Sequence, residues 1–113
     1  MQISINGIEI STEFVHTPEK ISKGMMGKRF KNPNDGMLFG MGNGKHSFWM
    51  KNCVQDLDIL FVKDGIINKI YHNCPPCETQ DCKHYNGSGN FVLELNGGFC
   101  KKHGIEEGDE LTM

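Results

Sequence analysis

Hydrophobic residues alternate with polar residues over several stretches of the chain, as in β-strands with one buried face. Near the N-terminus, apolar positions alternate over residues 3–5 and again over residues 8–10, on either side of Asn6-Gly7. Asn-Gly readily adopts the positive φ angles of a two-residue hairpin turn. The pattern therefore predicts that the chain opens with a β-hairpin.

The pattern changes after residue 16 and predicts a short helix over about residues 18–26. Thr17 offers a capping hydroxyl, Pro18 suits the first helical turn, and Glu19 places an acid at the positive helix end. Ile21 and Met25 lie one turn apart and share a face. A second short helix is expected to end near residue 103, before a glycine that can cap it.

The remaining hydrophobic segments predict further short strands. These cover about residues 37–39, 46–52, 57–62, 66–71, 91–95 and 110–112, whereas the glycine-rich residues 40–44 and 86–89 predict loops. Asp64-Gly65 predicts a hairpin between the third and fourth of these strands. About seven short strands, two short helices and no strand–helix–strand alternation predict a mostly β fold, a small antiparallel β-barrel-like single domain.

Length and charge narrow the classes of function. A chain of 113 residues is long enough for one hydrophobic core, so residues 1–113 are expected to form one domain. The net charge of -2, with acids and bases interleaved, predicts no nucleic-acid partner. No apolar run approaches the roughly 18 residues that span a bilayer, and the N-terminus lacks the pattern of a signal peptide. We therefore expect a cytoplasmic protein without a membrane partner.

A series of short motifs resembles the domain of unknown function 192 (DUF192) family over about residues 24–111. The motifs occur in the order and approximate spacing of that family: Gly36-Met37-Leu38-Phe39, Phe48-Trp49-Met50-Lys51-Asn52, Leu57-Asp58-Ile59, Val92-Leu93-Glu94 and Gly108-Asp109. The resemblance implies a compact, β-rich, barrel-like domain, and it implies no activity because none is assigned to the family. The chain departs from the family pattern at Asp56, usually a proline, and at Cys53, usually a threonine.

Three cysteines and a histidine lie close together in the sequence and form a candidate metal or redox site. They are Cys74, Cys77, Cys82 and His84. These residues have the ligand types of a tetrahedral zinc site, although only the first two cysteines have the usual two-residue spacing. The family resemblance points instead to a disulfide between the second and third cysteines, with the first as an addition. Zinc, a disulfide and free thiols therefore remain open, whereas thioredoxin-like chemistry lacks the required helix N-terminus.

An aromatic and polar patch around Trp49 is a second candidate site. Strand alternation places Phe48, Met50 and Asn52 on one face and Trp49 and Lys51 on the other. A tryptophan beside a lysine could bind a planar or anionic ligand, or a partner protein. In a small barrel, however, packing is the more frequent role of a tryptophan.

Acidic residues in or beside apolar strands are the third feature. An ionised carboxylate at Asp56, Asp58 or Glu94 would be costly unless it were paired or hydrogen-bonded. We expect Asp58 either to pair with Lys51 or to accept backbone N–H bonds at a turn. General acid–base chemistry at Asp58 or Glu94 is the alternative.

These patterns together predict a non-enzymatic binding or accessory module for an unknown small molecule or protein. Its candidate binding residues are Trp49, Lys51, Asn52, Asp58 and Glu94. The first alternative is a zinc-binding or thiol redox protein that uses Cys74, Cys77, Cys82 and His84. The second alternative is a small hydrolase that uses Asp58 or Glu94.

Overall fold

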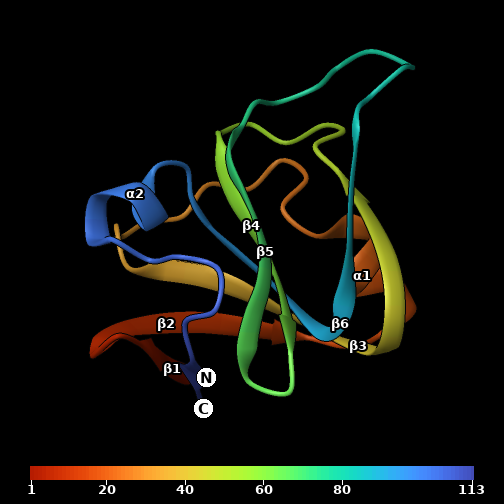
Figure 1. The fold of residues 1–113 in the computed structure, drawn as a ribbon. Helices are drawn as coiled ribbons and strands as arrows, with labels where there is room; N and C mark the ends of the chain where they lie inside the picture. The colour runs from red at the N-terminus through yellow and green to blue at the C-terminus, as the bar shows by residue number, and fades with distance from the viewer.

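The computed structural model describes residues 1–113, which form one seven-stranded sheet and two short helices (Figure 1). The strands are β1 (Gln2–Ile5), β2 (Ile8–Val15), β3 (Asp35–Trp49), β4 (Leu57–Lys63), β5 (Ile66–Cys74), β6 (His84–Asn96) and β7 (Leu111–Thr112). The helices are α1 (Pro18–Lys23) and α2 (Phe99–His103). The prediction of a mostly β fold with two short helices is confirmed.

The sheet curls into a half-barrel in the strand order β5-β4-β6-β3-β2-β1-β7. All neighbouring strands are antiparallel except β2 and β3, which run parallel because the connection through α1 crosses over between them. At one end the two edges of the sheet meet, since the backbone N–H of Leu111 donates to the Gly65 carbonyl over 2.7 Å. The two chain termini lie side by side in Figure 1, as the pairing of β1 with β7 requires.

Both predicted hairpins form where the turn residues indicated. Asn6 and Gly7 have φ angles of 53° and 77° between β1 and β2, and Asp64 and Gly65 have φ angles of 51° and 80° between β4 and β5. These are the left-handed conformations that two-residue hairpin turns need.

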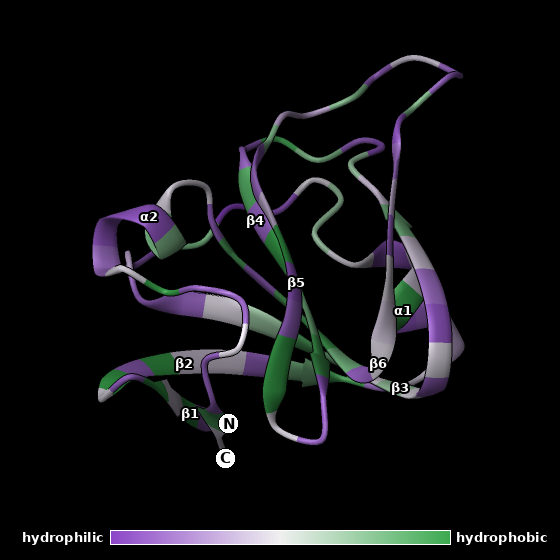
Figure 2. Ribbon diagram, in the orientation of Figure 1, coloured by the Kyte–Doolittle hydropathy of each residue, from purple (hydrophilic) through white to green (hydrophobic).

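The first helix, α1, begins at Pro18, where the sequence predicted. The Thr17 hydroxyl of α1 accepts a hydrogen bond from the Lys20 N–H over 3.4 Å. α1 ends at Lys23, three residues before the predicted end, because Gly24 leaves helical geometry with φ 46°. α2 ends at His103 as predicted, and Figure 2 shows that it changes from hydrophobic at its start to hydrophilic at its end. Neither helix has the length and apolar composition needed to cross a bilayer.

The two glycine-rich segments do not form the predicted loops. Residues 40–44 lie within β3 and residues 86–89 lie within β6, and the two strands pair from Gly36 to Trp49 with a register shift between Gly40 and Gly44. Glycine weakens a strand only locally, and hydrogen bonding to a long partner strand outweighs that preference. The strand predicted over residues 46–52 accordingly ends at Trp49.

Alternation along the central strands produces a hydrophobic cluster on each face of the sheet. On β4, Leu60 and Val62 join the cluster that α2 covers, whereas Ile59 and Phe61 join the cluster beside α1. This explains why β4 is apolar at nearly every position, because both of its faces are buried. The same alternation directs Glu94 of β6 toward the face beside α1.

Close packing at Gly87 gives a first testable prediction. A Cβ atom at this position of β6 would overlap the ring of Phe61, which is fully buried on β4. We expect Gly87→Ala to lower the free energy of unfolding by about 2–3 kcal/mol, because the ring must leave its rotamer or the strands must separate. Urea unfolding measures this loss. Gly42→Ala is the matched control, since no atom lies within 4 Å of the added methyl group. Equal stability of the two variants would contradict the packing described.

Candidate functional site

A cavity of about 440 Å³ lies between β3 and the segment that follows α1. Its apolar walls consist of Phe39, Met41 and Phe48 from β3 and of Met25 and Met26 from the segment after α1. The apolar part of the lining therefore combines flexible methionine side chains with aromatic rings from two parts of the chain.

Glu94 is the acid inside this cavity. Its side chain is only 3% exposed, and its backbone lies at the centre of the sheet, opposite Met37 of β3 and Ile59 of β4. The Glu94 Oε1 atom is buried without a hydrogen-bond partner. Burial raises the pKa of this carboxyl group to about 8, so the group is largely neutral at pH 7.

Cys53 lines the cavity beside Glu94 and is 7% exposed. Burial, and secondarily the charge of Glu94, raise the pKa of the Cys53 thiol to about 12. A thiol of such high pKa is a poor nucleophile, because the thiolate is the reactive form. An antiparallel β-bridge joins Cys53 to Met26 and holds the segment after α1 against the cavity.

Two residues of the predicted Trp49 patch lie at the edge of the cavity. Trp49 lines it, is 42% exposed, and places its ring centroid 5.9 Å from that of His84. Lys51 also lines it and donates from Nζ to the Thr79 carbonyl over 2.8 Å. Asn52 is exposed, has a φ angle of 59°, and does not line the cavity.

Asp58 lies on the opposite face of the sheet and is fully buried. Its carboxylate accepts backbone N–H bonds from Asn73 over 2.8 Å, from Gly98 over 3.0 Å and from Cys100 over 2.9 Å. The predicted pair with Lys51 is wrong, because backbone donors already surround the carboxylate and Lys51 reaches Thr79 instead. The other expectation, backbone N–H donors at a turn, is confirmed. Asp58 therefore ties the end of β5 to the start of α2.

The four residues of the predicted zinc site do not come together. Cys77 and Cys82 form a disulfide, and Cys74 is buried with a thiol pKa that burial raises to about 11. His84 points its Nδ1 atom to the Ser47 hydroxyl over 3.0 Å. Nowhere in residues 1–113 do three or more His, Cys, Asp or Glu side chains gather in a way that could hold a metal ion. The zinc interpretation therefore gains no support from this geometry.

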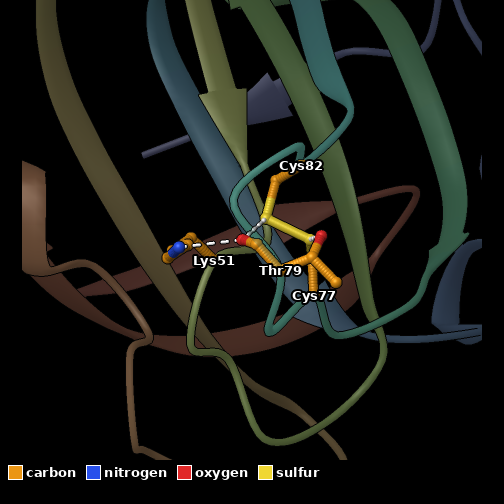
Figure 3. The surroundings of a disulfide bond; sticks show 4 residues. All are labelled: Lys51, Cys77, Thr79 and Cys82. Atoms are coloured by element: carbon orange, nitrogen blue, oxygen red, sulfur yellow. Dashed lines mark hydrogen bonds between the residues drawn. A yellow bond between two sulfur atoms is a disulfide. The ribbon is translucent and has the colours of Figure 1, made fainter.

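The disulfide holds the chain segment at one edge of the cavity. Figure 3 shows Lys51 reaching the Thr79 carbonyl within the loop that the Cys77–Cys82 bond closes. Backbone hydrogen bonds add to this contact, from the Cys77 N–H to Met50 over 3.1 Å and from the Asn52 N–H to Cys77 over 2.9 Å. The loop thus fixes the segment that carries Lys51.

Loss of this disulfide gives a second prediction. We expect the Cys77→Ser, Cys82→Ser double variant to lose about 2 kcal/mol of unfolding free energy, because the unfolded chain regains the entropy of a short closed loop. Chemical unfolding with and without dithiothreitol provides the test and its internal control. The reductant should lower the wild-type protein to the level of the variant and leave the variant unchanged. A wild-type protein that is insensitive to the reductant would contradict the prediction.

Sequence reasoning identified Glu94, Trp49 and Lys51 but missed most of the cavity wall. An acid among the apolar positions of β6 was a visible signal. Met26 and Cys53 carry no comparable signal. They reach the cavity because a β-bridge joins them, although they are 27 residues apart in the chain.

The curled sheet and the two short helices make this protein a small, mostly β domain, and a cavity with one buried acid is its candidate site. The chain belongs to the DUF192 family, described as an uncharacterised ACR, whose model matches residues 1–113. No protein with a curated description matches it.

Two solved structures share the fold. One, from Sinorhizobium meliloti 1021, is called a "putative transcription regulator"; it is 29% identical, has a TM-score of 0.86, and the match covers 97% of this chain and 90% of that one. The other is a protein of unknown function from Novosphingobium aromaticivorans DSM 12444. It is 29% identical, has a TM-score of 0.89, and the match covers 99% of this chain and 84% of that one.

Proposed function

We propose that this protein is a non-enzymatic binding module that holds a small molecule in the cavity around Glu94. The observation that carries the proposal is the Glu94 Oε1 atom, which is buried in the cavity wall without a partner. Such an atom costs about 1–3 kcal/mol unless a donor reaches it. A ligand that brings an N–H or O–H group into the cavity would supply that donor.

The size and lining of the cavity support the same proposal. Its volume of about 440 Å³ lies within the range of roughly 300–1,000 Å³ that is usual for small-molecule sites. Such sites combine apolar walls with a few polar groups that orient the ligand. Here Met25, Phe39 and Phe48 supply apolar wall, and Glu94 supplies the orienting group.

A thermal-shift screen with small water-soluble amines, amides and alcohols tests this function. We expect at least one compound to raise the melting temperature of the wild-type protein. The same compound should not change the melting temperature of the Glu94→Met variant, because methionine fills a similar space but offers no hydrogen-bond acceptor of comparable strength. Glu110→Gln, which changes an exposed acid just before β7, is the matched control and should respond like the wild type. The proposal fails if no compound stabilises the wild type, or if Glu94→Met responds equally.

A small hydrolase that uses Glu94 is the second candidate, because its raised pKa of about 8 suits a general acid or base near neutral pH. Asp58 does not share this role, since its carboxylate is engaged by three backbone donors away from the cavity. Turnover of p-nitrophenyl acetate tests the idea. Hydrolysis with an apparent pKa near 8 that Glu94→Gln abolishes would favour the enzyme; turnover that is unchanged in Glu94→Gln would reject it.

A further inference from the structure

The charged side chains of the cavity are divided between two regions. Glu94 is almost completely buried, whereas Lys23, Lys45 and Lys51 line the same cavity with exposed or half-exposed side chains. The three lysines come from three separate segments, namely the end of α1, the middle of β3 and the residues after β3. The cavity therefore has an acidic interior and a basic edge.

None of these three lysines is neutralised by an acid of the protein. The one salt bridge in the structure joins Lys28 to Glu13, outside this cavity. Lys51 uses one donor on the Thr79 carbonyl and keeps its positive charge available. The basic edge is thus unpaired, just as Oε1 of Glu94 is unpaired inside.

Apolar side chains line the same cavity as these polar groups. Met25, Phe39 and Phe48 are buried or half-buried members of one hydrophobic cluster. Aromatic rings near an acid also favour a cation, since their faces carry negative potential. A ligand that matches all three features has a cationic donor, a short apolar body and an anionic group.

We propose that the ligand of this cavity is a small zwitterion, with an ammonium group against Glu94 and a carboxylate or phosphate group at the three lysines. This inference rests on the proposed binding function. The buried ammonium gains a charge-assisted hydrogen bond in a water-poor site. The anion at the exposed edge meets positive charges that water only partly screens.

Ligand binding should also release a proton. Glu94 is largely protonated at pH 7, because burial raises its pKa to about 8. An ammonium group beside it favours the ionised carboxylate, so the bound state holds close to one proton fewer, on the order of one per ligand. A neutral ligand would not require this release.

Isothermal titration calorimetry with three matched probes tests the proposal: 6-aminohexanoate, hexylamine and hexanoate. We expect 6-aminohexanoate to bind about tenfold more tightly than either partial analogue, because only it satisfies both ends. Its binding enthalpy should depend on the ionisation enthalpy of the buffer, which reports the released proton. Glu94→Gln should abolish that dependence and weaken binding.

Lysine variants separate this inference from the proposed function. The Lys23→Ala, Lys45→Ala double variant should bind 6-aminohexanoate about fivefold more weakly and bind hexylamine with unchanged affinity. The Lys63→Ala, Lys101→Ala double variant is the matched control, because both of its lysines lie outside the cavity. The zwitterion proposal is overturned if hexylamine binds as tightly as 6-aminohexanoate, or if ω-aminoalkanoates of four to eight carbons all fail to bind. A Glu94-dependent hit of another class in the thermal-shift screen would then leave the cavity function standing.

Discussion

Asp58→Ala is expected to lower the free energy of unfolding by about 4 kcal/mol. The substitution removes the acceptor of the Asn73, Gly98 and Cys100 N–H groups at once. A buried donor left without a partner costs about 1–3 kcal/mol; the bond from Cys100 is buried, and those from Asn73 and Gly98 are partly buried. Urea unfolding followed by circular dichroism measures the loss. If Asp58→Ala does not fold, Asp58→Asn provides the measurable case.

Asp58→Asn retains one acceptor oxygen, so we expect it to lose about half as much stability as the alanine variant. Asp56→Ala is the matched control, because Asp56 is an exposed acid only two residues before Asp58. Its effect should stay within about 0.5 kcal/mol. An Asp58→Ala protein as stable as this control would show that the three N–H groups find other partners.

The stability of the wild-type protein is expected to fall by about 4 kcal/mol between pH 5 and pH 8.5 through Glu94 alone. Burial raises the pKa of Glu94 from 4.5 to about 8. The folded protein therefore binds more protons than the unfolded chain in this window, and the contribution is complete at low pH and lost as pH rises through 8. Above that range the buried carboxylate carries its full desolvation cost.

Urea unfolding of wild type and Glu94→Gln at several pH values isolates this contribution. The difference in stability between the two proteins should change by about the stated amount, since the variant has no proton to lose at residue 94. The measurements end at pH 8.5, because the Cys53 and Cys74 thiols ionise in the unfolded chain near their ordinary pKa of 9.0. Burial raises both pKa values in the folded protein, so these thiols would add their own pH dependence above that pH. Glu110→Gln should keep the full pH dependence. Parallel wild-type and Glu94→Gln curves would contradict the assignment.

Local signals in the sequence were sufficient for most elements of the fold. Asn6-Gly7 and Asp64-Gly65 predicted two hairpins because few other residues tolerate their backbone angles. Thr17 and Pro18 predicted the start of α1 because both act within one helical turn. Such features depend on neighbours in the chain, so they are visible without tertiary structure.

The long strands and the cavity depended on contacts between distant segments. Residues 40–44 and 86–89 have loop composition, yet they lie within β3 and β6, which pair with each other along their length. Met26 and Cys53 border the cavity because a β-bridge joins them. Neither arrangement can be read from one segment, since each residue's preference alone points elsewhere.

The sequence by itself determined the alternation that makes this chain a β domain, its turns, its helix caps and the presence of acids among buried positions. Only the tertiary structure decided what those acids do. On one face of the sheet, three backbone N–H groups surround Asp58; on the other, the methionines and aromatic side chains leave Glu94 Oε1 without a donor. The physical reason is that hydrogen bonding and desolvation of a carboxyl group depend on atoms brought near it by the fold, which are distant in the chain.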